Sequence, residues 1–419
     1  MPRILAYTSP ARGHLFPLTP ILDQLHRRGH AISVRTLASE VPLMRARGFD
    51  AAPISPRVEA IALMDWRAKN PRQALGLAVQ GFCDRATHDA ADLKDAIASE
   101  HPDLLLVDIN SWGALATAEA LGGPWASFCP YPMALRSRDV PPFGPGLPPA
   151  RGVLGRARDH LLRPLVMGMV EKTILAPLNR VRASVGVPPF ARADEVFLRP
   201  PLLLYMTAEP FEYPRSDWPQ NVLMIGPCAW EPPSEPPHWL SELEEPIVLV
   251  TTSSEFQDDS RLVATALEAL ADDKVQVVAT LPAGDPTTFK APKNAHIARF
   301  VPHSAVLDRA ACAITHAGMG ATQKALAHGV PVCAVPFGRD QLEVARRVEV
   351  ARAGSRLPAP RLTPLSLREK VHQAMACVDG ARRIAAAFAR AGGPTAAADA
   401  VERRLLGTPA SAGSAGAPA

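Results

Sequence analysis

Short β-rich runs alternate with helical patterns along almost the whole chain, and this alternation most limits the folds available to it. Such alternation is typical of a parallel sheet wrapped by helices. In the first half we expect strands at residues 3–8, 31–36, 104–108, 125–128, 202–205 and 222–225. In the second half we expect strands at residues 247–252, 275–279, 312–315 and 332–334. The fold class is therefore α/β.

A proline-dense stretch separates the two series of strands. Proline cannot join a central strand, so residues 227–246 are predicted to form a semi-rigid linker. The pattern predicts two Rossmann-like, doubly wound domains that face each other across a cleft, at residues 1–226 and 247–385. We expect a helix at 386–406 that packs back on the first domain, and a disordered tail at 407–419.

Composition excludes several classes of protein. Lys and Arg number 45 against 41 Asp and Glu, and a net charge of +4 is too small to indicate nucleic-acid binding. The sequence has no run of about 18 apolar residues, so we expect no stable membrane insertion. Six cysteines without a C-x-x-C pair indicate neither a zinc site nor a disulfide framework. We expect a cytoplasmic protein.

Two polar side chains end neighbouring strands of the first domain. His14 lies in the loop after the first strand, and Asp108 ends the buried run 104–107. Ligands of open α/β sheets bind at this edge, and an acid beside an imidazole is half of a catalytic triad. A helix-start histidine and a helix-capping aspartate are the structural alternatives.

A glycine-rich turn follows a strand in the second domain. Small residues such as Gly318 and Gly320 let the backbone of this turn approach a ligand, and the N–H groups of a helix start attract phosphate oxygens. Ser253 and Ser254 end another strand of this domain, and the pair Asp340 and Gln341 can bind sugar hydroxyls.

Four ordered motifs resemble one known family. They are Phe300-Val301-Pro302-His303, Thr315-His316-Ala317-Gly318-Met319-Gly320, Gly329-Val330-Pro331 and Pro336-Phe337-Gly338-Arg339-Asp340-Gln341. In this order they resemble the donor signature of the family-one glycosyltransferases with the GT-B fold, in particular their bacterial natural-product (macrolide or antibiotic-type) branch. The segment Ala11–Pro17 extends the resemblance to nearly the whole chain.

The resemblance implies a role for each matching position. His14 would be the general base, supported by Asp108, in an acceptor-binding first domain. The second domain would bind the nucleotide sugar, with Phe300 stacking on the base. The full set of expected donor-binding residues is Ser254, Phe300, Val301, His303, His316, Gly318, Met319, Gly320, Ala321, Thr322, Asp340 and Gln341.

The chain departs from the family pattern at three positions. Lys324 replaces a glutamate that accepts hydrogen bonds from the ribose, and an ammonium group can only donate. His303 and Ser253 replace a common glutamine and glycine. These changes fit either a dTDP-sugar or a differently held UDP-sugar. Lys324 would reach a phosphate or face solvent.

The expected reaction is a hexosyltransferase-type transfer in one inverting displacement. His14 would remove the acceptor proton while the diphosphate departs against the helix start at 318–322. The chain contains no D-x-D motif, so we expect no metal and no cofactor besides the nucleotide-sugar co-substrate.

The acceptor is expected to be an apolar aromatic or polyketide natural product, a small molecule rather than a nucleic acid. Core packing is the structural alternative for each aromatic residue considered, and the enzyme would be a monomer or homodimer. The candidate acceptor-binding residues are Trp66, Phe82, Trp112, Phe128, Tyr131 and Phe143.

Three other hypotheses remain at this stage. A sugar-nucleotide-binding auxiliary protein without turnover would fit the altered Lys324, although it would not need a base. A Rossmann oxidoreductase lacks its G-x-G-x-x-G turn. Finally, residues 136–165, expected to form a long irregular lid loop, combine arginines with apolar residues and could lie on an anionic membrane surface.

Overall fold

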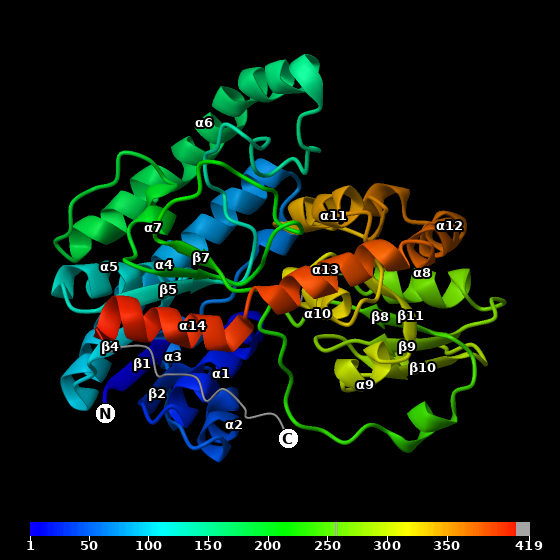
Figure 1. The fold of residues 1–419 in the computed structure, drawn as a ribbon, viewed down its shortest axis with the longest axis horizontal. Coiled ribbons are helices and arrows are strands. Elements are labelled where there is room, and N and C mark those ends of the chain that lie inside the picture. Colours follow the sequence, from blue (N-terminus) through cyan, green and yellow to red (C-terminus); the bar gives the residue numbers. More distant parts are fainter. Residues whose placement is uncertain (256, 258, 408–419) are drawn as a thin grey trace, which may run out of the picture.

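The computed structural model describes residues 1–255, 257 and 259–407, and within them the chain forms two parallel sheets (Figure 1). The first sheet has seven strands: β1 (Arg3–Tyr7), β2 (Ala31–Thr36), β3 (Asp50–Pro53), β4 (Leu104–Asp108), β5 (Trp125–Cys129), β6 (Leu203–Tyr205) and β7 (Val222–Met224). The second has six: β8 (Ile247–Thr251), β9 (Gln276–Thr280), β10 (Ala295–Ala298), β11 (Ala310–Thr315), β12 (Val332–Ala334) and β13 (Gly354–Arg356).

Both sheets reverse their strand order beside their first strand. The order is β3-β2-β1-β4-β5-β6-β7 in one sheet and β10-β9-β8-β11-β12-β13 in the other, and every pairing is parallel. Ile4 pairs with Leu104, and Leu249 pairs with Ala313, at the two reversal points. Such points open a crevice at the carboxyl ends of the strands, which is where ligands of these sheets bind.

Helices cover both faces of each sheet, because strands such as β4 and β8 are apolar on both sides. One face of the first sheet packs against α1 (Arg12–Arg27) and α2 (Val41–Ala46). The other face packs against α4 (Pro71–Glu100), α5 (Trp112–Leu121) and α6 (Gly152–Ser184), and two short helices, α3 (Pro56–Glu59) and α7 (Glu195–Leu198), lie in the connections.

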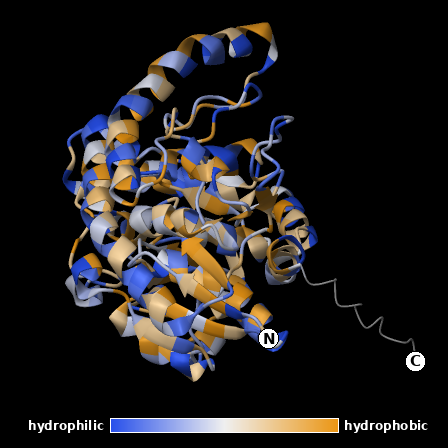
Figure 2. Cartoon of the chain, turned by 90° about the vertical axis from the view of Figure 1, so that its left-hand side faces the viewer, coloured by the Kyte–Doolittle hydropathy of each residue, from blue (hydrophilic) through white to orange (hydrophobic). Residues whose placement is uncertain are grey.

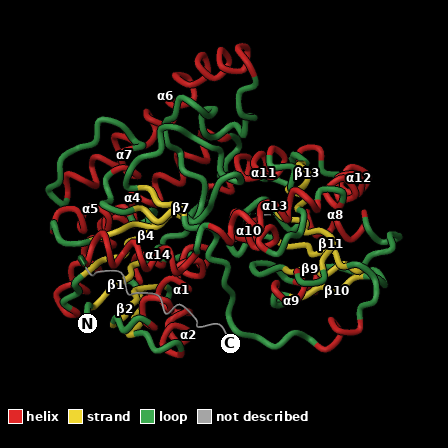
Figure 3. Tube along the Cα trace, in the orientation of Figure 1, coloured by secondary structure: helices red, strands yellow, loops and turns green. Residues whose placement is uncertain are grey.

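The second sheet is covered in the same way, and the long linker between the sheets runs at the edge of the molecule (Figure 3). One core cluster includes α10, α11 and α13, and another includes α8 and α12. The helices of this part are α8 (Arg261–Ala269), α9 (His303–Leu307), α10 (Met319–Ala327), α11 (Gln341–Val350), α12 (Pro364–Met375) and α13 (Val378–Arg390).

The C-terminal segment is two helices rather than the single helix expected at 386–406. Gly392, with φ of 84°, separates α13 from α14 (Gly393–Val401), because a left-handed residue breaks the helical ladder. The α14 helix packs on the first sheet's cluster beside α1, and Glu402 pairs with Arg28 at 2.6 Å. Of the tail expected at 407–419, residues 408–419 lie outside the described part.

The segment 136–165 is not one loop, which corrects the expectation from its prolines. Only residues 136–151 are irregular, and α6 begins at Gly152 and accommodates Pro164 and Pro177 within its length. Its first half projects from the body and mixes polar and apolar residues without a single apolar stripe (Figure 2). Four large apolar side chains are exposed there: Val153, Leu154, Leu161 and Leu165. The sequence of this half therefore lacks the regular helical spacing of apolar residues that indicates a half-buried helix. Among the helices in the described part, none is long and apolar enough to cross a bilayer.

Candidate active site

The carboxyl ends of both sheets' central strands open into one shared cleft. The cleft has a volume of about 460 Å³, and residues from both halves of the chain and from the linker line it. His14 and Tyr131 line it from the first half, and His316, Gly318 and Asp340 line it from the second. The two reversal points therefore face a common space.

His14 and Asp108 form a close pair on the first side of the cleft. His14 is the third residue of α1, Asp108 ends β4, and the Nδ1–Oδ1 distance is 2.8 Å. The carboxylate is fully buried, and its other oxygen accepts from Ser9 N at 2.9 Å and from Ser9 Oγ at 2.7 Å. These donors fix Asp108 and leave one oxygen for the imidazole.

Burial and charge act in opposite directions on this pair. Burial disfavours the charged imidazole, but the adjacent Asp108 carboxylate outweighs it, so the pKa of His14 is raised above its usual value. Burial would raise the pKa of Asp108, but His14 and the hydrogen-bond donors lower it. The Asp108 carboxylate is therefore ionised. It accepts the Nδ1–H of His14 and stabilises the imidazolium that forms when Nε2 takes a second proton.

The start of α10 faces His14 from the second half. Gly318 is the N-cap of α10 and has no side chain that could accept a hydrogen bond from the first N–H groups of the helix. Thr322 N–H makes the first hydrogen bond within the helix, to Gly318 O at 3.0 Å. The N–H groups of Met319, Gly320 and Ala321 precede it and lie at the cleft. This helix end can bind an anion.

His316 lies beside that helix start. It is 7% exposed and lines the cleft, and burial lowers its pKa, so the ring is neutral near pH 7. A Cβ on Gly318 would lie 2.2 Å from His316 Nε2. Only glycine lets the turn and the imidazole pack this closely.

Phe300 and His303 occupy one end of the cleft. Phe300 is 48% exposed, an unusual state for a large apolar side chain, and it offers a flat face for stacking. His303 Nε2 lies 2.9 Å from Thr280 Oγ1, and burial and the nearby Lys324 lower the pKa of His303 to about 4. A neutral His303 can therefore donate or accept at this end.

Of the two alternatives expected for Lys324, reaching a phosphate or facing solvent, the structure excludes the second, because Lys324 lines the cleft and is paired. Its Nζ lies 3.0 Å from Glu231 Oε2, and Glu231 comes from the linker. Glu231 also accepts from His303 N and Ser304 N at 3.0 Å each. Burial opposes its ionisation, but Lys324 and the Ser304 donors hold the pKa of Glu231 at about 2. The linker thus supplies the carboxylate that α10 lacks.

Asp340 and Gln341 differ in their relation to the cleft. Asp340 lines it, and burial raises its pKa. Gln341, expected to face a sugar, is 2% exposed, because its Oε1 accepts from Phe337 N and Gly338 N and its Nε2 donates to Gln257. Gln341 therefore shapes the turn before α11 rather than lining the cleft.

Most of the expected donor-site residues do lie together. The cleft-lining ones are Ser254, Phe300, His303, His316, Gly318, Met319, Gly320, Ala321 and Asp340. Thr322 is not among them, because its hydroxyl is buried against Thr315 and its N–H is used within α10. The side chain of Val301 is 1% exposed and packs in the core, and Val301 is absent from the cleft lining.

The expected acceptor residues are mostly elsewhere. Tyr131 lines the cleft, whereas Phe128 is fully buried in the core cluster that contains α1. Phe82 and Trp112 pack on each other at 5.3 Å in the opposite cluster. Trp66 and Phe143 are also absent from the cleft lining. Alternation along β5 explains Phe128, because successive side chains of a strand point to opposite faces.

Several residues in or beside the cleft were not among the expected site residues. Trp230 and Glu231 come from the proline-rich linker, and Phe16 packs edge-on against Trp230 at 5.2 Å. Arg339 spans the cleft, since its Nε and Nη2 bond Asp65 of the first half at 2.7 and 2.9 Å. Asn110, two residues after Asp108, contacts His14. Its position after a strand end was the one available signal.

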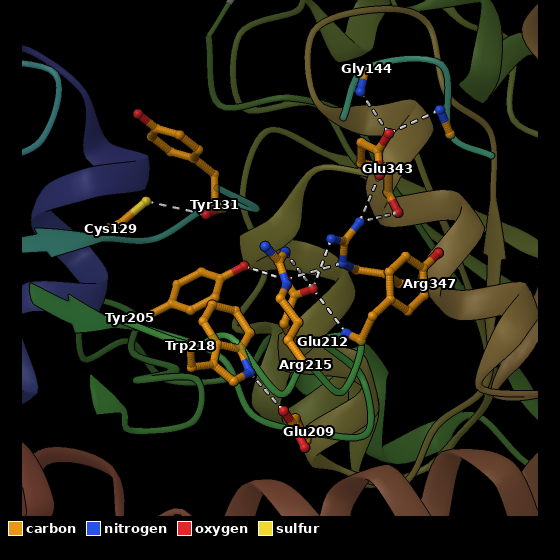
Figure 4. Close-up of polar contacts among 12 residues, drawn as sticks. Cys129, Tyr131, Gly144, Tyr205, Glu209, Glu212, Arg215, Trp218, Glu343 and Arg347 are labelled. Atoms are coloured by element: carbon orange, nitrogen blue, oxygen red, sulfur yellow. Dashed lines mark hydrogen bonds and ion pairs between the residues drawn. The ribbon is translucent and has the colours of Figure 1, made fainter. Parts of the chain in front are cut away.

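A buried ion network joins the two halves beside the cleft (Figure 4). Arg347 of α11 is 2% exposed and pairs with Glu212, which follows β6, at 2.9 Å. It also pairs with Glu343 at 2.9 Å, and Glu343 accepts from Gly144 N at 2.7 Å and Gly146 N at 2.9 Å. The network ties the loop 136–151 to the helix that follows Asp340.

Comparison with known proteins gives consistent relatives. Residues 264–403 match the family model described as "Erythromycin biosynthesis protein CIII-like, C-terminal domain". The chain is 34% identical over 396 residues to 4'-demethylrebeccamycin synthase of Lentzea aerocolonigenes, covering 88% of this chain and 90% of that protein.

Solved structures show the same fold. The calicheamicin glycosyltransferase CalG4 matches with a TM-score of 0.73 and 21% identity, over 98% of this chain and all of that one. The glycosyltransferase VinC, solved with dTDP, matches with a TM-score of 0.71 and 21% identity, over 97% of this chain and all of that one.

Proposed function

This chain belongs to the GT-B glycosyltransferases of antibiotic biosynthesis, and from that premise we propose that it transfers a sugar from a dTDP- or UDP-sugar by an inverting, metal-independent displacement. The acceptor is the hydroxyl of an apolar aromatic or polyketide natural product. The observation that carries the proposal is the His14–Asp108 pair facing the open start of α10 across one cleft. We assign acceptor binding to residues 1–226 and donor binding to residues 247–385.

The base of the proposed reaction is His14. With Nδ1 donating to Asp108 at 2.8 Å, Nε2 is the unprotonated nitrogen and takes the proton of the acceptor hydroxyl. The freed oxygen attacks the anomeric carbon, and Asp108 stabilises the imidazolium that forms. A single attack from the face opposite the leaving group inverts the anomeric configuration.

The leaving diphosphate is stabilised by the second half of the chain. Its developing charge meets the N–H groups of Met319 to Ala321 and the neutral His316, which is able to donate. Fixed donors of this kind can balance a diphosphate without a cation. Support for a thymidine donor comes from VinC, which was solved with dTDP.

The remaining cleft wall fits an apolar acceptor. Phe16, Tyr131, Met206 and Trp230 line it near His14. An auxiliary protein that only bound the nucleotide would not need the buried, hydrogen-bonded His14–Asp108 pair next to this wall, so the geometry favours a catalytic protein over a binding protein.

A product assay tests the proposal. The protein is incubated with dTDP- and UDP-sugars and a panel of aromatic and polyketide alcohols, with and without EDTA. We expect a glycoside whose anomeric configuration, read by NMR coupling constants, is opposite to that of the donor, at a rate that EDTA does not change. A retained configuration, or a rate abolished by EDTA and restored by Mg²⁺, would contradict it.

A further inference from the structure

Asn110 contacts Nε2 of His14, the nitrogen that takes the proton in the proposed reaction. Its Nδ2 is 3.2 Å from His14 Nε2, and its Oδ1 accepts from Tyr131 Oη at 2.7 Å. Its backbone N–H donates to Asp108 Oδ1 at 2.9 Å. Residues 108, 110 and 131 thus surround the imidazole with a continuous chain of hydrogen bonds.

When the His14 ring is neutral, these hydrogen bonds allow one consistent assignment of donors and acceptors. Asp108 can only accept, so His14 Nδ1 carries the proton and Nε2 is the acceptor. The Asn110 side chain must then present its NH₂ to Nε2, which leaves Oδ1 for the Tyr131 hydroxyl. Tyr131 therefore holds the amide in the orientation that covers the lone pair of the base.

We propose that Asn110 is a positioning residue that covers the His14 lone pair until an acceptor displaces it, and so protects the bound sugar nucleotide from hydrolysis. The inference rests on the proposed transfer reaction and adds a control step to it. Tyr131 holds the cover in place and lines the cleft, and its ring lies 5.8 Å from that of His14.

The protected reaction is the same displacement with water as the nucleophile. Water would give its proton to His14 Nε2, its oxygen would bond the anomeric carbon, and the bond from that carbon to the diphosphate oxygen would break with its electron pair. Free sugar and nucleoside diphosphate would result. A covered lone pair cannot accept that proton.

An acceptor differs from water in what it gains by binding. A natural-product alcohol buries apolar surface against Tyr131 and the nearby cleft wall, and this favourable burial offsets the lost Asn110 hydrogen bond. A water molecule gains nothing comparable. The geometry thus links exposure of the base to the presence of the acceptor.

The Asn110 amide and the carboxylates around the ring have opposite effects on the protonation of His14. Asp108, Glu255 and Asp340 face His14 and favour its protonated form. An N–H donor on Nε2 favours the neutral form, because a protonated nitrogen cannot accept it. Tyr131 follows β5, and its hydroxyl donates to the Asn110 amide oxygen. Loss of the amide should therefore raise the pH at which the base becomes protonated.

Asn110→Ala tests the proposal, since it keeps the backbone N–H that holds Asp108. We expect the ratio of donor hydrolysis to transfer to rise about tenfold, the worth of one hydrogen bond of about 1.4 kcal/mol. The acceptor KM should fall, and the acid limb of the kcat/KM profile should move to higher pH. Tyr131→Phe should change the ratio in the same direction by less.

Controls separate the possible outcomes. Gln80→Ala removes an exposed amide on α4 and should leave all three readouts unchanged. Asn110→Asp keeps the shape but places an acceptor on Nε2, so its acid limb should move furthest upward, and it serves if the alanine variant does not fold. A wild-type protein that transfers no sugar would defeat the proposed function. Normal transfer with an unchanged hydrolysis ratio in Asn110→Ala and Tyr131→Phe would overturn this inference alone.

Discussion

At the residue scale, His14 is the group whose protonation sets the activity. A base works only when unprotonated, so the rate should fall as the pH drops through the raised pKa of His14. Asp108 causes that rise and also fixes the ring with Nδ1 protonated. One substitution at Asp108 should therefore change both the pH profile and the maximal rate.

In Asp108→Asn we expect the acid limb of kcat/KM to move to lower pH, because the carboxylate that stabilises the imidazolium is gone. The plateau should fall roughly 10²-fold, since the amide no longer enforces the productive tautomer. Asp95→Asn, on the exposed face of α4, is the matched control. A limb that moved upward would contradict the assigned pair.

Gly318→Ala tests the packing at the start of α10. The new methyl group would lie 2.2 Å from His316 Nε2, so the imidazole must move away from the helix start. We expect the KM for the sugar nucleotide to rise at least about tenfold, the effect of losing roughly 1.4 kcal/mol of binding. Gly123→Ala meets nothing within 4 Å and is the control. Equal donor KM values in both variants would refute the role of this turn.

At the element scale, buried strands are the part of the fold that sequence predicts best. The expected bounds of 31–36, 104–108 and 332–334 are those observed. The last two runs are buried throughout and therefore continuously apolar up to the strand end, and most of 31–36 is buried as well. The first half of α6 could not be found, since its exposed leucines follow no core-facing period. The GT-B fold is nevertheless confirmed by the solved relatives.

In the candidate site, too, the sequence predicts some residues and misses others. His14 and Asp108 could be paired in advance, because parallel strands bring their carboxyl ends to one edge. Glu231 could not be placed, since only tertiary contacts decide where a proline-rich linker passes. Gln341 sits in a matching motif, yet its amide is used by its own turn. Motifs predict which loops meet, and local hydrogen bonding decides which side chains remain available.

The docking of α14 gives a prediction at this scale. Val401 is fully buried against the first sheet's core, so Val401→Asp places a charge where water cannot reach it. We expect a loss of at least about 2 kcal/mol in unfolding free energy, measured by urea denaturation. Arg403→Asp, on an exposed neighbour, should cost far less. Equal losses would mean that α14 does not stabilise the first half.

At the scale of the whole molecule, Arg347 joins the two halves through buried charge. It pairs with Glu212 from the first half and with Glu343 on its own helix. Arg347→Met should lower the unfolding free energy by about 3–5 kcal/mol, because the buried carboxylate of Glu212 loses its nearer cation and keeps the more distant Arg215 at 3.4 Å. Adding Glu212→Gln should recover part of that loss in a double-mutant cycle, and purely additive losses would contradict the coupling.

The central claim is that a base from one half and an anion site from the other act on one substrate pair. Parallel measurements of nucleotide affinity by calorimetry and of single-turnover transfer, on His14→Ala and His316→Ala, test it most directly. The account predicts that His14→Ala binds dTDP or UDP as the unmodified protein does but transfers at least roughly 10²-fold more slowly, whereas His316→Ala binds the nucleotide more weakly. Transfer at the normal rate by His14→Ala, or unchanged nucleotide affinity in His316→Ala, would contradict it.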